Sequence, residues 1–271
     1  MSNTATVLAF DFGASSGRAI RAVYDGQNLT YEEIHRFENI PIEKDGHLCW
    51  DVETLLKEIH TAIQKAGTFD SLGFDTWGVD FGLLDTDGHL LANPVHYRDA
   101  RTNGKPEQAA ACMPAEELYA HTGNQIMAIN TLFQLLALQE QEPELLQKAE
   151  QILFMPDLFA ALLGAEPVCE RSIASTSQML DPRTGQWSRE VLTAYGLKEN
   201  HFAPLVASGT VTGTLTTGAK IIAVAGHDTQ CASAAMPCAE EDAEHTAFLS
   251  CGTWSLLGTE LDTPILTAHS C

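Results

Sequence analysis

The stretch VLAFDFGASSGRAI at residues 7–20 gives the strongest indication of the fold. Two apolar, β-rich segments, residues 7–10 and 19–24, flank a turn that contains Gly13 and Gly17. A Rossmann fingerprint and a Walker A loop both need a helix N-terminus after their glycines, but here a second strand follows. The stretch therefore predicts a β-hairpin with a glycine- and serine-rich turn.

The segments that follow extend this hairpin into an α/β domain. A third β-rich segment, residues 31–37, predicts an antiparallel meander. Asp51 is placed to cap a helix whose apolar positions 55, 56, 59 and 63 share one face, and which ends at Gly67 before a strand at residues 71–75. Further elements are expected as follows: a tight hairpin around residues 86–88, helices at 130–139 and 157–163, and a strand at 221–225 that turns at Gly226 into a helix at 229–235.

The hairpin plan appears a second time near the end of the chain. Residues 247–258, AFLSCGTWSLLG, again predict a strand, a turn of Gly, Ser and Thr, and a strand. The acidic run before them, residues 237–244, predicts a domain boundary. We therefore divide the chain into a first domain at residues 1–244 and the start of a second, truncated domain at residues 245–271. Two such hairpins, each turning a phosphate loop toward a shared cleft, are the layout of an actin-like ATPase.

The composition excludes several classes of partner. Lys and Arg number 15 against 36 Asp and Glu, which gives a formal net charge of -21, and such a surface repels nucleic acid and anionic membranes. A phosphate-bearing ligand must then be bound locally, by backbone N–H groups, a metal ion or a few basic residues. The seven cysteines form no C-x-x-C pair, which predicts reduced thiols. We find no targeting signal or membrane span in the sequence and expect a cytoplasmic protein.

The turn at residues 11–18 is the first candidate site. Gly13 and Gly17 let the backbone approach a phosphate, Ser15 and Ser16 add donors, and Asp11 at the strand end is placed to hold Mg²⁺. An ordinary hairpin turn without a ligand explains the octapeptide equally well.

The second candidate site combines aromatic and charged residues near two strand ends, namely Asp75, Trp77, Gly78, Tyr97, Arg98 and Asp99. Carboxylates and guanidinium groups pair with hydroxyls, and aromatic faces cover C–H surfaces, so this set suits a sugar better than a metal ion. The alternative is that Trp77 and Tyr97 are core aromatics and that the charged residues form a surface ion-pair cluster.

The third and fourth candidates also follow strands. Asp228, after Gly226 and His227, would stand at the carboxyl edge of the sheet, where it is placed to accept a proton from a sugar hydroxyl. His227 and Thr229 beside it are placed to hydrogen-bond the substrate. The alternative is that Asp228 merely caps a helix. In the second hairpin, Gly252 and Thr253 would supply further phosphate donors, unless they too form a plain turn.

These segments, in this order and at these spacings, resemble the FGGY carbohydrate kinases, and among them the rhamnulokinases in particular. The resemblance extends from Val7 to about Gly258. It implies a ribonuclease-H-like (actin-like ATPase) fold with a mixed β-sheet flanked by helices. The implied reaction is transfer of the γ-phosphoryl group of ATP to the 1-hydroxyl of L-rhamnulose, with Mg²⁺, in L-rhamnose catabolism. The residues it implicates are Ala14 to Arg18 and Thr253 at ATP, Gly78 and His227 to Thr229 at the sugar, and Asp228 as the proton acceptor.

The chain departs from the family in length, because members are much longer and carry a complete second ATPase domain. We therefore expect impaired activity. We also expect residues 245–271 to pack on the first domain, to be loosely ordered or to mediate self-association. Two alternatives stay open: a kinase for another ketose such as L-fuculose or L-xylulose, and a non-catalytic sugar-binding remnant. A Rossmann dehydrogenase is disfavoured, since the glycines lie between two strands.

Overall fold

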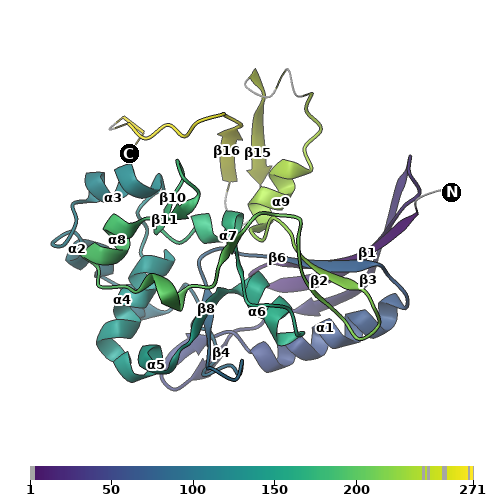
Figure 1. The fold of residues 1–271 in the computed structure, drawn as a ribbon, viewed down its shortest axis with the longest axis horizontal. Coiled ribbons are helices and arrows are strands. Elements are labelled where there is room, and N and C mark those ends of the chain that lie inside the picture. The colour runs from purple at the N-terminus through teal and green to yellow at the C-terminus, as the bar shows by residue number, and fades with distance from the viewer. Residues whose placement is uncertain (1–3, 240–241, 243–244, 252–254, 268, 271) are drawn as a thin grey trace.

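A six-stranded mixed sheet forms the centre of the molecule (Figure 1). The computed structural model describes residues 4–239, 242, 245–251, 255–267 and 269–270. The strand order is β13-β14-β6-β1-β2-β3. The bounds of these strands are β1 Ala5–Phe12, β2 Ser16–Tyr24, β3 Leu29–Glu38, β6 Ser71–Thr76, β13 Thr210–Thr214 and β14 Lys220–Ala223.

The predicted meander and the helix after it are confirmed. Strands β1, β2 and β3 pair antiparallel in sequence order, and β6 then joins β1 in parallel. Helix α1 (Val52–Ala66) makes the crossover, with the Asp51 carboxylate accepting the Thr54 N–H at 3.2 Å and Gly67 ending the helix at φ +66°. A side-chain cap and a glycine with positive φ are local features, so both ends of this helix were predictable from the sequence.

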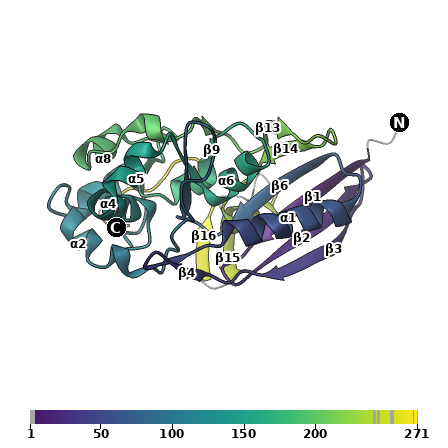
Figure 2. The same ribbon diagram turned by 90° about the horizontal axis from the view of Figure 1, so that it is seen from below.

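Side-chain alternation gives the sheet two different faces. Leu8, Phe10 and Phe12 of β1 are fully buried, and Phe12 stacks on Phe159 of α6 (Met155–Leu162) at 4.8 Å between ring centroids. Helices α1 and α6 cover this apolar face, as Figures 1 and 2 show. Because successive residues of a strand point to opposite sides, Asp11 lies on the other face.

A mostly helical lobe follows β6. Its short strands are β7 Phe81–Leu84, β8 Gln151–Phe154, β9 Cys169–Glu170, β10 Leu180–Asp181, β11 Gln186–Trp187 and β12 Leu205–Val206, and a further pair, β4 Ile42–Lys44 and β5 His47–Cys49, precedes α1. Its helices are η1 Ala100–Thr102, α2 Lys105–Ala109, α3 Ala115–Thr122, α4 Thr131–Gln141, α5 Pro143–Lys148, α7 Arg171–Ser175, α8 Arg189–Ala194 and η2 Glu199–His201.

Two predicted elements of this lobe differ in detail. The helix expected at 157–163 begins earlier, at Met155, because Pro156 occupies the first turn, where its missing N–H costs nothing. The tight turn at residues 86–88 is confirmed by the bond from Asp85 N to His89 O at 2.9 Å. However, β7 pairs along its length with β8, a partner that the sequence reasoning did not predict.

The C-terminal hairpin forms a separate two-stranded sheet. Strands β15 (Ala247–Cys251) and β16 (Ser255–Thr259) pair antiparallel, as predicted. The hairpin contacts α9 (Asp228–Ala234) and stands on the opposite side of the large sheet from α1 (Figure 1). Leu249 and Leu257 are 62% and 76% exposed. The division of the chain into domains at residue 244 stays a prediction.

None of the helices in the described part of the chain combines the length and the apolar character that crossing a bilayer requires.

Candidate active site

Asp11 and Asp75 lie side by side on the open face of the sheet. They are direct partners in the parallel pairing of β1 with β6, and Arg18 is the partner of Asp11 on β2. The Arg18 Nε donates to Asp11 Oδ2 at 2.8 Å. The hairpin that carries the predicted phosphate loop therefore places a carboxylate and a guanidinium group beside the end of β6.

The turn before α9 reaches the same place from the other direction. Gly226 accepts a hydrogen bond from Thr76 N at 2.9 Å, and His227 continues the pairing with Thr76 at the carboxyl end of β6. Asp228 is the first residue of α9, and its side chain is 42% exposed. The alternative that Asp228 merely caps the helix is wrong, because the N-cap of α9 is His227 and α9 has no side-chain cap hydrogen bond among the described residues. The Asp228 Oδ1 accepts the N–H of the next residue, Thr229.

Electrostatics show that three carboxylates converge here. Burial, followed by the charges of Asp11 and Asp228, raises the pKa of Asp75 to about 8. Burial, followed by Asp75 and other nearby acids, raises the pKa of the Cys231 thiol to about 12. Burial also lowers the pKa of His227, whose Nε2 lies 3.4 Å from Asp228 Oδ1, so this imidazole is neutral at pH 7. Asp11 and Asp228 therefore belong to one site.

The phosphate-loop candidate is a fixed turn. Gly13 N donates to Ser16 O at 2.9 Å, and Asn39 bonds both sides of the turn through its side-chain amide to Gly13 O and its backbone N–H to Ser15 O. Gly17 was predicted to let the backbone approach a phosphate closely. The structure adds another cause, because a Cβ at Gly17 would lie 2.3 Å from the Phe37 ring. Gly252 and Thr253 lie outside the described residues.

Asp80 organises the aromatic part of the second candidate site. This carboxylate is 1% exposed and accepts from Trp50 Nε1 at 2.6 Å, Trp77 Nε1 at 3.0 Å and Tyr97 N at 3.1 Å, with Gln134 on its other oxygen. Burial raises its pKa to about 6, against the opposing effect of these donors. Trp77 is 6% exposed, and Asp80 occupies its N–H, which favours the core-aromatic alternative for Trp77.

Tyr97 and Arg98 lie near enough to Asp228 for its charge to act on Tyr97. The Arg98 guanidinium is 5.4 Å from the centre of the Tyr97 ring. Burial raises the pKa of Tyr97, and the negative charge of Asp228 contributes to this rise.

Gly78 packs against Thr176, whose Oγ1 accepts the Val79 N–H at 3.0 Å. Val79 has φ +68°, a strained conformation for a β-branched residue and a common mark of functional sites.

Asp99 serves a different part of the molecule. Its carboxylate accepts from Leu48 N and Arg101 N and contacts His47 Nδ1 at 3.1 Å. His47 and Arg101 line a separate pocket of about 160 Å³, and Asp11, Asp75 and Asp228 are not among the residues that line it. For Asp99 the structure therefore favours the alternative of a structural ion-pair cluster over sugar contact.

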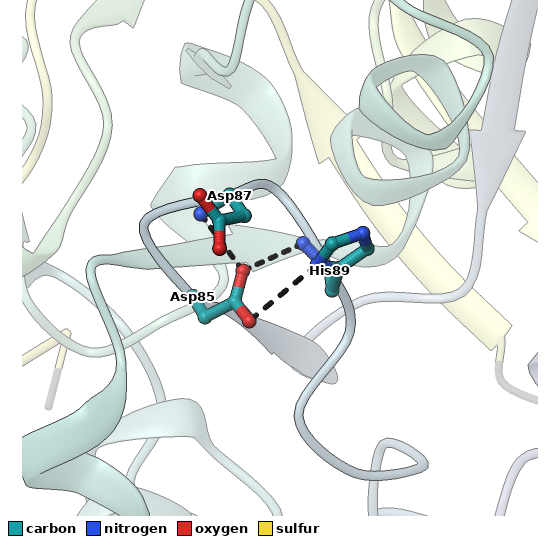
Figure 3. Close-up of side chains that lie close together, drawn as sticks. All are labelled: Asp85, Asp87 and His89. Carbon is teal, nitrogen blue, oxygen red and sulfur yellow. Dashed lines mark hydrogen bonds and ion pairs between the residues drawn. The ribbon is translucent and has the colours of Figure 1, made fainter.

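One group of side chains among the described residues has metal-ligand spacing, and it does not include Asp11, Asp75 or Asp228. Asp85, Asp87 and His89 lie within 4.8 Å of one another in the exposed hairpin turn after β7 (Figure 3). Asp85 Oδ1 accepts from Asp87 N at 2.9 Å and His89 N at 2.8 Å, so the carboxylate closes the turn. This cluster is part of a turn and does not join the three carboxylates of the site.

Glu170 was missed by the sequence reasoning. It is 1% exposed and accepts the Gly226 N–H at 3.0 Å, directly before His227 and Asp228. The sequence does not reveal this role of Glu170, because the donors that link it to the site, on Ser208 and Gly226, come from distant segments.

Comparison with known proteins identifies the family and the fold. The model of the FGGY family of carbohydrate kinases, N-terminal domain, matches residues 6–234. Rhamnulokinases from Bacteroides thetaiotaomicron and Pectobacterium atrosepticum are 41% and 40% identical over 276 and 268 residues, which cover 97% and 95% of this chain and 56% and 53% of those proteins. The chain thus spans about half the length of the curated relatives it matches.

Solved structures agree on the architecture. A carbohydrate kinase from Novosphingobium aromaticivorans superposes with a TM-score of 0.79 at 22% identity, over 99% of this chain and 58% of that one. Gluconate kinase from Lactobacillus acidophilus gives a TM-score of 0.72 at 17% identity, over 82% and 48%. The predicted ribonuclease-H-like, actin-like ATPase fold is confirmed. With a family match over most of its length, the chain belongs to the FGGY family of carbohydrate kinases.

Proposed function

We propose that this chain carries the sugar site and the first phosphate loop of an ATP-dependent kinase that phosphorylates the 1-hydroxyl of L-rhamnulose, in L-rhamnose catabolism. The observation that carries the proposal is the convergence of Asp11, Asp75 and Asp228 at the carboxyl end of β6. The substrate is suggested by the two relatives described as rhamnulokinases.

The residue types present suit a divalent cation and a polyphosphate. The carboxylates of Asp11 and Asp228 offer oxygen donors of the kind that Mg²⁺ prefers, and the ion usually keeps several waters that would complete its ligands. Asp75, whose pKa burial and then these two charges raise to about 8, would not add a negative charge at neutral pH. Asp11 would hold the ion, which would neutralise charge on the phosphates of ATP. The N–H and hydroxyl groups of residues 14–17 would donate to phosphate oxygens, and Arg18 would add a positive charge beside them.

The acceptor hydroxyl would be activated by Asp228. An accessible carboxylate at the sheet edge is suited to accept the hydroxyl proton as the oxygen attacks phosphorus. His227, held neutral by burial, would offer a hydrogen bond to the sugar without adding charge. Gly78, Arg98 and Thr229 would complete the sugar contacts.

The test combines binding and turnover. Calorimetry with L-rhamnulose, L-fuculose and L-xylulose is expected to give the highest affinity for L-rhamnulose, and ATP with Mg²⁺ is titrated separately. Asp228→Asn should lower the phosphorylation rate by about 10²–10⁴-fold, the usual contribution of a general base, while the ketose affinity changes only a few-fold. The matched control is Asp87→Asn in the exposed turn. A rate that Asp228→Asn leaves unchanged would remove Asp228 as the base, and equal binding of all three ketoses would remove the substrate assignment.

A further inference from the structure

Glu170 is the centre of a buried hydrogen-bond network behind the candidate base. Its Oε2 accepts from Ser172 N at 2.9 Å, Ser172 Oγ at 2.6 Å, Ile173 N at 3.2 Å and Gly226 N at 3.0 Å, and its Oε1 accepts from Ser208 Oγ at 2.6 Å. Five donors from three segments therefore meet on one side chain that is 1% exposed. Such a network fixes the relative positions of the segments that supply the donors.

The segment directly before Asp228 is held from both sides. The N–H of Gly226 points to Glu170, and the carbonyl of Gly226 accepts from Thr76 N at 2.9 Å. The next residue, His227, directs its N–H to Ser172 Oγ at 3.5 Å, and Ser172 is itself bound to Glu170. There is also little free space, since a Cβ at Gly226 would lie 2.8 Å from Pro156 Cγ. The turn is therefore fixed through Glu170 on one side and through β6 on the other.

We infer that Glu170 is a positioning residue, which sets the direction of the turn from Gly226 to Asp228 and thereby holds His227 and Asp228 against the sugar. This inference rests on the proposed function for the roles of His227 and Asp228. Among the described contacts, Glu170 has no hydrogen bond to His227 or Asp228 themselves, and this buried side chain acts on them through Gly226 and Ser172.

Asp157 holds the backbone of Glu170 in place. It is 4% exposed, and its Oδ2 accepts the Glu170 N–H at 3.1 Å. Burial raises the pKa of Asp157 well above its usual range, and the neighbouring Glu170 raises it further. This rise favours the protonated form of Asp157, which limits negative charge in the buried network.

A purely structural explanation has to be separated from positioning. Glu170 is also the N-cap of α7, where it accepts from Ser172 N and Ile173 N, so its loss would lower stability in any case. The chain offers a matched control, because Ser188 caps α8 in the same way by accepting Val191 N at 3.3 Å. Ser188 has no bond to the Gly226 turn among the described contacts.

The experiment compares Glu170→Gln with Ser188→Ala in the whole chain. Glutamine keeps the shape of the side chain but replaces the carboxylate by a neutral amide, whose oxygen accepts more weakly from Gly226 N. We therefore expect amide hydrogen exchange at Gly226 to accelerate at least tenfold and the affinity for L-rhamnulose to fall at least tenfold. Ser188→Ala should lower the melting temperature while leaving both readouts unchanged. Calorimetry and NMR-detected exchange are run well below both melting temperatures.

The outcomes separate this inference from the proposed function. If the unmodified chain binds L-rhamnulose and Glu170→Gln binds it equally well, Glu170 does not position the site, whatever happens to exchange at Gly226. If the unmodified chain binds no ketose, the proposed function fails. The exchange rate of Gly226 then still decides whether Glu170 fixes the turn, and an unchanged rate in Glu170→Gln overturns that.

Discussion

Two hairpins of the same plan occupy very different environments in this molecule. In β1–β2, Leu8, Phe10 and Phe12 are fully buried within a six-stranded sheet that α1 and α6 cover. In β15–β16, Leu249 and Leu257 are 62% and 76% exposed, and the two strands form a sheet by themselves. A two-stranded hairpin alone is marginally stable in water. The difference teaches that the strand pattern sets the pairing, whereas the stability comes from what covers the apolar face.

The two hairpins also differ in how firmly they are held next to the candidate active site. The loop on β1–β2 is attached to a rigid sheet and fixed by Asn39, so Asp11 has a defined position relative to Asp75. Among the described residues, the second hairpin makes its main contact with α9, the helix that begins with Asp228, and pairs with no strand of the large sheet. Rigid geometry is what a site that acts by positioning requires, and here the β1–β2 side supplies it.

The largest expected difference between the hairpins is the cost of losing an apolar side chain. Phe10→Ala should lower the free energy of unfolding by about 3–5 kcal/mol, because the ring is fully buried between Phe74 and Phe12. The matched change Leu249→Ala should cost about 0.5 kcal/mol or less, since most of that side chain is already in water. Urea unfolding followed by circular dichroism measures both. Equal costs would show that β15–β16 is as firmly packed as β1–β2.

Local patterns made much of the fold predictable. The meander, the helix capped by Asp51 and ended at Gly67, and the strand of residues 71–76 all follow from alternation and from residues at fixed offsets. The pairing of β7 with β8 was not predictable in this way, because the strands are separated by the helices from η1 to α5 and neither carries a turn signal that names its partner.

The candidate site was only partly predictable, for the same reason. Asp11 and Asp228 each follow a strand, which is a local signal, and the structure brings both to Asp75. Asp80 and Glu170 look like ordinary acidic residues in the sequence. Their importance comes from donors on distant segments, such as Gln134 for Asp80 and Gly226 for Glu170. Burial of this kind is created by tertiary packing, so residue spacing does not reveal it.

The second-largest expected effect is a loss of folding stability at low pH that comes from a buried histidine. His96 is 5% exposed and stacks on Trp50, and burial lowers its pKa from 6.5 to about 4. The unfolded chain therefore binds a proton that the folded chain does not, so stability is fully present above pH 6.5 and falls as the pH drops toward 4. The loss from this residue amounts to about 3 kcal/mol.

A variant isolates this contribution of His96. Asparagine at position 96 keeps an acceptor for the Arg98 N–H, which His96 Nδ1 now accepts at 2.9 Å, but it does not titrate. The difference in unfolding free energy between the unmodified chain and His96→Asn should be constant above pH 7 and change by about 3 kcal/mol between pH 6.5 and 4. Taking the difference cancels Asp80, whose raised pKa acts in the opposite direction. His245→Asn, at an exposed position after α9, is the control, and a flat difference for His96→Asn would contradict the prediction.

A smaller effect is expected at two glycines that face a phenylalanine ring across a strand pair. Gly17 is the register partner of Phe37, and Gly258 is the partner of Phe248; an added Cβ would lie 2.3 Å and 2.5 Å from the respective ring. Phe37 is 8% exposed and contacts Phe12, so its ring has no room to move. Gly17→Ala should therefore cost about 1–3 kcal/mol.

The matched change in the second hairpin should be nearly neutral. Phe248 is only partly buried, so its ring is free to turn toward solvent, and Gly258→Ala should cost about 0.5 kcal/mol or less. Thermal unfolding by calorimetry compares the two variants. A Gly258→Ala cost that matches that of Gly17→Ala would mean that the Phe248 ring is as confined as the Phe37 ring.

The smallest effect on stability should come from Leu257→Lys. Because Leu257 is 76% exposed, a lysine there keeps its charge in water, and the free energy of unfolding should change by about 0.5 kcal/mol or less. What should change is association, since exposed leucines on an unpartnered hairpin form an apolar surface that a charge disrupts. Sedimentation velocity over a range of protein concentrations should show less self-association for Leu257→Lys than for the unmodified chain. If Leu257→Lys instead destabilises the fold by several kcal/mol, the leucine is packed in solution, and the contrast between the two hairpins no longer holds.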